Sequence, residues 1–232
     1  MNDDLYWLVD SHRGKTLDKW QSYLRCYETL FSPLRDEQIA LLELGVQNGG
    51  SLEIWSQFFP HADVIVGCDS NPLCAELSFD DPRIKVVVGN SAAASTLASI
   101  TEVTPEYDVI IDDAAHTSDN IIANFANFFP LVRKGGVYVV EDLHCSYWSD
   151  YGGGLYTHHS AISFFKALIY LLNQEHVEAG DQRGLDRFRR KIEHYGIHAP
   201  EGLADCVVSL EFRNSMAVIR KGEEGERLLG TV

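Results

Sequence analysis

Short apolar runs alternate with helical segments along most of the chain after residue 38. The runs include IALLELGV, ADVIVGCDS, RIKVVVGN, DVIIDDA and GGVYVVED, and the segments between them include GSLEIWSQFF and SDNIIANFANFFPLV. Near-continuous β-branched runs separated by helices are typical of parallel strands that are covered on both faces. The pattern therefore predicts an α/β fold, a Rossmann-like doubly wound domain with a mostly parallel sheet.

The two ends of the chain carry different patterns. Residues 16–34 have Leu17, Trp20, Leu24, Tyr27 and Leu30 at helical spacing, which predicts an amphipathic helix that ends near the proline at position 33. The last two apolar runs, CVVSLEF and MAVIRKG, are separated by three polar residues and predict an antiparallel hairpin. We expect a helical cap over residues 1–35 and one larger domain over residues 36–232, and leave the role of residues 175–204 open.

The charge composition of the chain disfavours nucleic acids and membranes as binding partners. The formal net charge is -15, from 34 acidic and 19 basic side chains, so the surface should repel nucleic acids and anionic membranes. No apolar run approaches the roughly 20 residues of a membrane span. The five cysteines are scattered and form no CxxC pair, as in proteins of a reducing compartment. We expect a cytoplasmic protein with a small-molecule or glycosyl substrate, and a homo-oligomer is left open.

The stretch ELGVQNGGS, Glu43 to Ser51, follows the first predicted strand and opens a helix, where α/β sheets bind nucleotide-like ligands. Gln47 stands where a dinucleotide fingerprint needs glycine, which disfavours NAD. Asp69, at the end of the next strand, is placed to bind two ribose hydroxyls. A ribose without a pyrophosphate fits S-adenosylmethionine, whose ammonium and sulfonium suit Glu43. The alternative is a tight turn at Gly49 with Asp69 as a helix cap.

Two pairs of carboxylates end the fourth and fifth predicted strands. They are Asp112 with Asp113 and Glu141 with Asp142. If the strands are neighbours, four carboxylates meet at one rim, and a cation such as Mg²⁺ relieves their repulsion. Strand alternation turns Asp112 and Asp113 to opposite sides, so we favour Asp113, Glu141 and Asp142 as metal ligands and a supporting role for Asp112. The alternative is that these acids cap helices or pair with arginine and lysine at positions 133 and 134.

A histidine follows each carboxylate pair. His116 lies three residues after Asp113, where it could take a proton from a hydroxyl held at the metal. His144 competes for the same role. The next stretch, SYWSDYGGGLY at residues 146–156, combines four aromatic residues with three glycines. Such a loop could close over a sugar, or it could be an ordinary connection whose aromatic side chains are buried in the core.

The motifs ELGVQNGGS, GCDSNP, DVIIDDAAH and VVEDLHCSYW together resemble class I S-adenosylmethionine-dependent methyltransferases over about residues 36–150. Within that class they are similar to the metal-dependent O-methyltransferases that modify macrolide sugars, of the mycinamicin and macrocin type, and to the related cephalosporin hydroxylase-like family. The resemblance implies a seven-stranded sheet. It also implies a magnesium ion on Asp113, Glu141 and Asp142, and His116 as the base.

The sequence of this chain departs from the family pattern at two places. Alanines occupy positions 114 and 115, where the family has Gly-Ser, and Asn90 stands where an aspartate often contacts the adenine amino group. The cofactor-binding residues expected from the motifs and the resemblance together are Glu43, Gly45, Gly49, Ser51, Asp69, Asn90 and Asp112.

The sequence therefore predicts a Mg²⁺-dependent enzyme that transfers the methyl group of S-adenosylmethionine to a hydroxyl on a glycosyl group of a natural product or surface saccharide. A second hypothesis is a non-catalytic S-adenosylmethionine-binding subunit that assists a partner enzyme. A cofactor-binding subunit alone has no physical need for the set Asp113, His116, Glu141 and Asp142. A third, a nicotinamide-dependent oxidoreductase, is weakened by Gln47.

Overall fold

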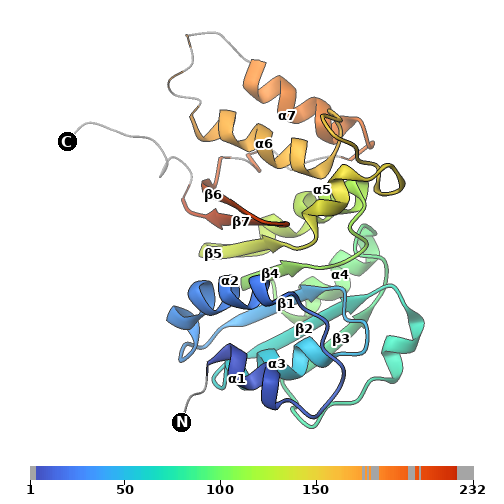
Figure 1. The fold of residues 1–232 in the computed structure, drawn as a ribbon, viewed down its shortest axis with the longest axis vertical. Helices are drawn as coiled ribbons and strands as arrows, with labels where there is room; N and C mark the ends of the chain where they lie inside the picture. The colour runs from blue at the N-terminus through green and yellow to red at the C-terminus, as the bar shows by residue number, and fades with distance from the viewer. Residues whose placement is uncertain are drawn as a thin grey trace, which may run out of the picture. The chain divides into compact units, whose positions relative to one another are not determined.

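The computed structural model describes residues 4–173, 176, 178, 183–197, 202–203 and 205–223 (Figure 1). Its strands form one sheet with the order β3-β2-β1-β4-β5-β7-β6. β1 and β3 both run parallel to β2, whereas β7 runs antiparallel to β5 and to β6. The expected Rossmann-like doubly wound fold with a C-terminal antiparallel hairpin is confirmed. The strands are β1 (Ala40–Leu44), β2 (Val64–Asp69), β3 (Ile84–Val88), β4 (Tyr107–Asp112), β5 (Val132–Val140), β6 (Val207–Arg213) and β7 (Met216–Lys221).

The helices of the described residues are short to medium in length, and none of them is long and apolar enough to cross a membrane. Two short 3₁₀ helices, η4 (Leu143–Tyr147) and η5 (Ser149–Tyr151), follow β5. The α-helices are α1 (Leu5–Ser11), α2 (Gln21–Phe31), α3 (Gly50–Phe58), α4 (Ala94–Val103), α5 (Ser118–Phe128), α6 (Ala161–Leu172) and α7 (Arg183–Glu193).

The chain forms two compact units, Met1–Val109 and Ile110–Val232. In the first unit every residue of β1 is buried, as expected for a strand covered on both faces. Tyr27 and Phe31 of α2 make edge contacts with Trp55 of α3, so α2 belongs to the core of this unit. The expected division at residue 35 stays a prediction.

The predicted N-terminal helix begins later than expected. α2 starts at Gln21, and residues 12–20 form a non-helical segment, called the strap below. Two lysines of the strap bind carboxylates of β1 and α3, and these contacts hold it out of helical geometry. Pro33 lies in the first turn of a 3₁₀ helix directly after α2, as its fixed φ favours.

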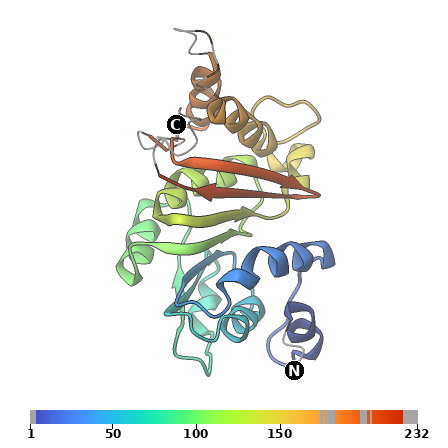
Figure 2. The ribbon, with the colours of Figure 1, turned by 90° about the vertical axis from the view of Figure 1, so that its left-hand side faces the viewer.

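In the second unit an aromatic cluster joins the helices to β5. Phe125 of α5 contacts Tyr138 of β5 and both Phe164 and Phe165 of α6, and Phe188 of α7 stacks on Phe164. Figure 2 shows β6 and β7 as long antiparallel strands beside β5. Only part of residues 175–204, whose role the sequence left open, lies within the described residues.

Candidate active site

The glycine loop, residues 45–50, leaves β1 and enters α3 through left-handed backbone conformations. Gly45, Gln47 and Gly49 have φ values of 94°, 52° and 87°. Asp69 at the end of β2 holds this loop, because its Oδ2 accepts hydrogen bonds of 2.9 Å from the backbone N–H groups of both Val46 and Gln47. A carboxylate has about four acceptor sites. The half-buried Asp69 therefore keeps capacity for ribose hydroxyls while it shapes the loop.

Glu43 of β1 is fully buried, and its carboxylate has two partners within the first unit. Its Oε2 accepts a 2.5 Å hydrogen bond from Ser51 Oγ, and its Oε1 lies 3.2 Å from Lys19 Nζ. The Lys19 side chain is only 2% exposed. The structure thus pairs Glu43 with Ser51, and the partner that balances the carboxylate is a lysine of the strap. Contact of Glu43 with the cofactor stays a prediction.

The paired glycines of the loop allow other segments of the same chain to pack closely against its backbone. A Cβ atom at Gly50 would lie 2.0 Å from the carbonyl oxygen of Thr16 in the strap, and one at Gly49 would meet the Phe79 ring at 2.6 Å. The strap and Phe79 therefore cover this part of the loop. The predicted role of Gly49 at the cofactor remains a prediction, and its close packing gives it a structural reason as well.

The residue predicted to bind the adenine, Asn90, follows β3 and is exposed. Its Oδ1 accepts a 2.9 Å hydrogen bond from the backbone of Ala92, which closes a local turn. The same oxygen has a second acceptor site for an adenine amino group. This contact stays a prediction.

Asp112 is buried at the end of β4, with 1% of its surface exposed. It accepts hydrogen bonds from Asn124 Nδ2 at 2.8 Å and from Tyr138 Oη at 3.0 Å. Burial raises the pKa of Asp112 to about 7, and it raises the pKa of Tyr138 well above its ordinary value, so the phenol remains a donor. These contacts give Asp112 the supporting role that strand alternation predicts. They do not test its expected place beside the cofactor.

The other predicted acids and His116 lie together in the second unit and are called the acid–histidine cluster: Asp113, His116, Glu141 and Asp142. His116 Nε2 lies 3.9 Å from Asp113 Oδ1 and 3.6 Å from Asp142 Oδ2. Ligand atoms of Asp113, His116 and Asp142 lie within 4.8 Å of one another, and Glu141 offers an oxygen within the same distance of Asp113. All three residues predicted as metal ligands are thus near neighbours.

The donor atoms of this cluster fit a hard divalent cation. Asp113 has a carboxylate oxygen of Asp142 and one of Glu141 within 4.8 Å of its own ligand atoms. Carboxylates this close repel each other, and oxygen ligands are those that Mg²⁺ prefers. Glu141 is buried with 2% exposure, while Asp113 and Asp142 are half-buried and reachable by an ion and its waters. Asp113, Glu141 and Asp142 would hold the ion. Their role as ligands remains a prediction.

Two members of the cluster have unusual backbone conformations. His116 and Asp142 have φ values of 57° and 53°, in the left-handed region. Such residues concentrate at functional sites, because the strain must be maintained by the surrounding structure. The left-handed residue after β4 is His116 itself, and neither Ala114 nor Ala115 has a positive φ. The substitution of Gly-Ser by alanines therefore leaves the turn intact.

His144, the competing base, follows Asp142 by two residues and lies in η4. Its Nδ1 is 2.6 Å from Ser215 Oγ and 3.7 Å from Asp142 Oδ1. Ser215 lies in the β6–β7 turn, and its carbonyl also accepts a hydrogen bond from Leu143 N. The hairpin thus fixes His144, whereas His116 contacts two carboxylates of the cluster. This geometry favours His116 as the base and His144 as a positioning residue.

The aromatic loop at residues 146–156 is compact and closed by its own backbone. Gly153 N and Gly154 N donate to the carbonyls of Trp148 and Ser146. Tyr147 and Trp148 are about half exposed, at 48% and 50%, and Tyr156 is exposed. The alternative in which these aromatic side chains are buried in the core is therefore wrong. Trp148 makes an edge contact with His144, the residue that lies 3.7 Å from Asp142 of the cluster.

Local sequence carries no signal for two of the residues that shape these sites. Lys19 stands in a stretch whose spacing predicts a helix, as an ordinary polar residue of an amphipathic pattern. Ser215 is one of the three polar residues between the last two apolar runs. Each acts through a partner far away in the sequence, Glu43 and His144 respectively, so local spacing could not reveal the contact.

Comparison with known proteins agrees with this geometry. A family model described as rhamnosyl O-methyltransferase/CmcI matches residues 10–150. An 8-demethyl-8-(2-methoxy-α-L-rhamnosyl)-tetracenomycin-C 3'-O-methyltransferase of Streptomyces olivaceus is 29% identical over 96% of this chain and 55% of its own length. A demethylmacrocin O-methyltransferase of Streptomyces fradiae is 30% identical over 90% of this chain and 51% of its own. The chain thus spans about half the length of these relatives.

A solved structure is also similar. The MycE methyltransferase from the mycinamycin biosynthetic pathway, in complex with Mg and SAH, superposes with a TM-score of 0.77 at 26% identity. The match covers 96% of this chain and 55% of that one. The family model covers more than half of the chain, and the resemblance drawn from the motifs is confirmed. The chain belongs to the rhamnosyl O-methyltransferase/CmcI family of S-adenosylmethionine-dependent O-methyltransferases.

Proposed function

We propose that this chain transfers the methyl group of S-adenosylmethionine to a hydroxyl of a glycosyl group, in a natural product or a surface saccharide, and that the transfer depends on Mg²⁺. The observation that carries the proposal is the acid–histidine cluster, which a protein that only binds the cofactor would not need. The names of the relatives support the acceptor class, because one names a rhamnosyl tetracenomycin and another names demethylmacrocin.

Cofactor binding, metal binding and proton transfer fall to different residues of the chain. The glycine loop and Asp69 hold the ribose and orient the sulfonium methyl group. Asp113, Glu141 and Asp142 hold the metal, and the chemistry that magnesium supplies when bound is Lewis acidity toward the acceptor hydroxyl. His116 Nε2 takes the hydroxyl proton, and Asp142 at 3.6 Å stabilises the imidazolium that results.

Atoms and electrons balance in this transfer. A lone pair of the hydroxyl oxygen forms the new O–CH₃ bond in line with the breaking S–CH₃ bond, whose electron pair returns to sulfur. The products are a methyl ether, S-adenosylhomocysteine and a proton on His116. The contribution of the protein is mainly orientation of the two reactants and electrostatic stabilisation.

The test begins with calorimetric titration of S-adenosylhomocysteine, in magnesium and again in excess chelator. We expect micromolar binding in both buffers. Phenyl α-L-rhamnoside and related glycosides are then offered with S-adenosylmethionine. We expect methylation that chelator abolishes, because the ion that Asp113, Glu141 and Asp142 would hold would supply Lewis acidity toward the acceptor hydroxyl and would not be needed for cofactor binding.

The Asp113→Asn variant gives the first residue-level prediction. It removes one carboxylate charge from the cluster, and we expect a loss of about 10²-fold or more in methyl transfer with cofactor affinity largely unchanged. Asp150→Asn, which removes an exposed carboxylate of η5, is the matched control. Full activity in excess chelator would refute the metal role. Cofactor binding without methylation of any glycoside would favour the assisting subunit.

A further inference from the structure

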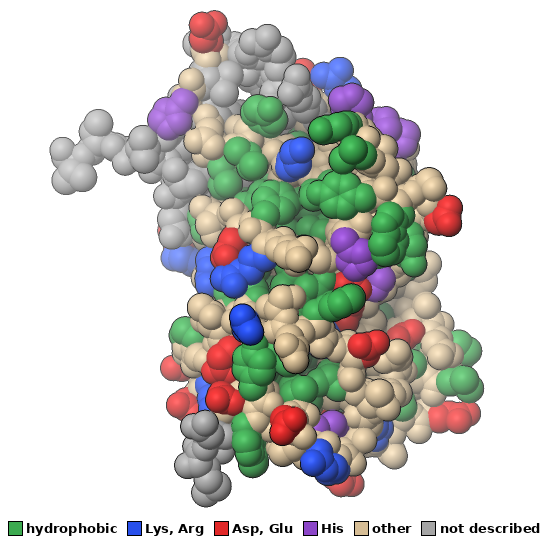
Figure 3. All heavy atoms as spheres, viewed as in Figure 1, with side chains coloured by type: hydrophobic (Ala, Val, Ile, Leu, Met, Phe, Trp, Pro, Cys, Tyr) green, Lys and Arg blue, Asp and Glu red, His purple; other side chains and the backbone are tan. Residues whose placement is uncertain are grey.

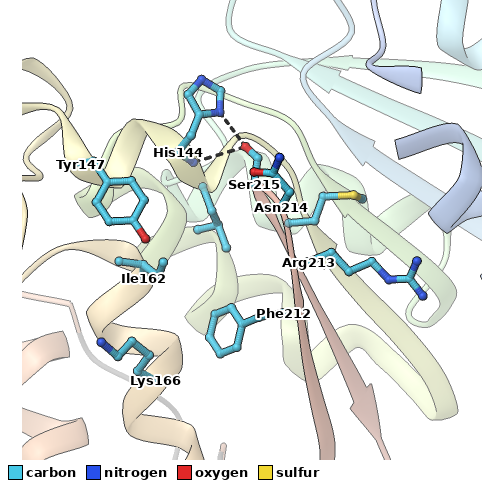
Figure 4. Close-up of a pocket in the computed structure, with 10 residues that line it drawn as sticks. His144, Tyr147, Ile162, Lys166, Phe212, Arg213, Asn214 and Ser215 are labelled. Atoms are coloured by element: carbon cyan, nitrogen blue, oxygen red, sulfur yellow. Dashed lines mark hydrogen bonds between the residues drawn. The ribbon is translucent and has the colours of Figure 1, made fainter. Parts of the chain in front are cut away.

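A cavity of about 310 Å³, called the acceptor pocket below, lies in the second unit. Its walls come from η4, from the first turns of α6, and from the β6–β7 hairpin (Figure 4). Pockets of this size hold small organic molecules, and apolar walls with a few polar groups are typical of them. Of its lining residues, the sequence singled out His144 as a competing base and Tyr147 as part of the aromatic loop that could close over a sugar.

The acceptor pocket adjoins the acid–histidine cluster through one side chain. His144 lines the pocket, and its Nδ1 lies 3.7 Å from Asp142 Oδ1 of the cluster. Ser215 at the hairpin tip, which also lines the pocket, fixes this ring. A molecule whose hydroxyl reacts beside His116 therefore has room for its remainder on the far side of His144.

The charge of the pocket differs from that of the chain. The chain has a formal charge of -15, yet the ten residues described as lining this pocket include no aspartate or glutamate. Lys166 and Arg213 are among them, and Arg213 is already paired with Glu211 at 2.6 Å. Lys166 is exposed, and in Figure 4 it lies at the end of the view opposite His144.

The rest of the lining is largely apolar. Leu143 and Met216 form buried parts of the wall, and Phe212 and Tyr147 are partly exposed at 37% and 48%. In the space-filling view, hydrophobic side chains gather on the upper half of the visible face, together with histidines (Figure 3). A ligand that matches these walls has an apolar body and a negative group.

We propose that the acceptor pocket binds the aglycone of the glycoside, and that this aglycone is apolar and carries a carboxylate that pairs with Lys166. The inference rests on the proposed function for the position of the sugar and deepens it by naming the class of acceptor. Charge complementarity supplies the argument: a carboxylate placed between apolar walls near an ammonium gains more than one in open water.

The test uses two rhamnosides that differ in charge and by one methyl group. The probes are 4-carboxyphenyl α-L-rhamnoside and its methyl ester, and binding to the full chain is measured by calorimetry with S-adenosylhomocysteine and magnesium present. We expect the acid to bind on the order of fivefold to tenfold tighter than the ester. In Lys166→Met this preference should disappear while the ester binds as before. Lys134→Met, which removes an exposed lysine of β5, is the matched control and should keep the preference.

Each outcome decides the question. Equal binding of acid and ester to the wild-type chain, or an unchanged preference in Lys166→Met, would overturn the inference. Methylation kinetics provide a separate readout, because kcat/KM for the acid should fall in Lys166→Met and that for the ester should not. If no glycoside is methylated although the acid binds through Lys166, the proposed function fails and the charge selectivity of the pocket still stands.

Discussion

At the scale of single residues, the buried pair of Lys19 and Glu43 links the strap to β1, directly before the glycine loop. The side chain of Glu43 has no exposed surface and that of Lys19 is 2% exposed, so each charge compensates the other away from water. Ser51 at the start of α3 donates to the same carboxylate. A change at Lys19 should therefore reach the loop that is proposed to bind the cofactor.

We predict that Lys19→Met lowers the free energy of unfolding by about 2–4 kcal/mol, because it leaves a buried carboxylate without its ammonium partner. Affinity for S-adenosylhomocysteine should fall as well. Urea unfolding and calorimetric titration measure the two effects. Lys15→Met is the matched control, since the ion pair of Lys15 with Glu53 is partly exposed and contributes less.

The double variant Lys19→Met with Glu43→Gln separates charge from shape. It removes both charges of the pair, so we expect it to recover most of the lost stability. Equal stabilities of wild type and Lys19→Met would show that the pair does not support the loop.

At the scale of elements, one arginine ties the end of α3 to the start of β3. Arg83 donates from Nη1 to the carbonyls of Phe59 and Pro60, both at 2.8 Å, and from Nη2 to the carbonyl of Ser56. The last carbonyls of a helix have no partner inside the helix, and this side chain satisfies one of them, that of Ser56. Asp81 holds the guanidinium through both of its oxygens.

The pair predicts a pH dependence of stability. Hydrogen bonds from Arg83 hold the pKa of Asp81 below its ordinary value. The unfolded state therefore binds more protons as the pH falls toward and below that ordinary value, so the stabilisation is complete at neutral pH and is lost in acid. We expect Asp81→Asn to cost about 1 kcal/mol at pH 7.

Urea midpoints measured from neutral pH downward check this prediction. The difference between wild type and Asp81→Asn should shrink once the pH falls below roughly 4. Glu102→Gln, which removes an exposed carboxylate of α4, serves as the control. A difference that stays constant into acid would mean that the hydrogen-bond geometry, and not the charge, stabilises this junction.

At the scale of the whole molecule, the excess of acidic side chains makes the chain sensitive to cations. The net charge of -15 is screened by any salt, whereas the acid–histidine cluster would respond to a divalent ion in particular. A ligand that binds only the folded state raises its stability by mass action.

We therefore predict that magnesium raises the midpoint of thermal unfolding more than sodium chloride of equal ionic strength does. The excess should be about 2–4 °C for each kcal/mol of binding free energy gained. Differential scanning fluorimetry measures it, with Asp113→Asn as the control. That variant should keep the response to salt and lose the additional response to magnesium. An identical response of both proteins would argue against the cluster as the site.

The sequence by itself determined the order and type of most elements and the places of the charged motifs. Near-continuous apolar runs and period-3.6 patterns report burial directly, so the strands and the C-terminal hairpin were predictable. The acids of DVIIDDAAH and VVED end two of these strands, which predicts that they meet if the strands are neighbours. The strap was not predictable, because Leu17 and Trp20 continue the helical spacing, and the contacts of its lysines with Glu43 and Glu53 override it.

Only the tertiary structure decided which partners these groups have. His144 is fixed by Ser215, a residue 71 positions away, and the apolar pocket with Lys166 exists only because α6, η4 and the hairpin come together. Asp112 and Asp113 are adjacent in sequence, yet one is buried against Asn124 and the other lies in the cluster. Local patterns specify which face a side chain takes, but the groups that it meets there are set by packing between distant segments.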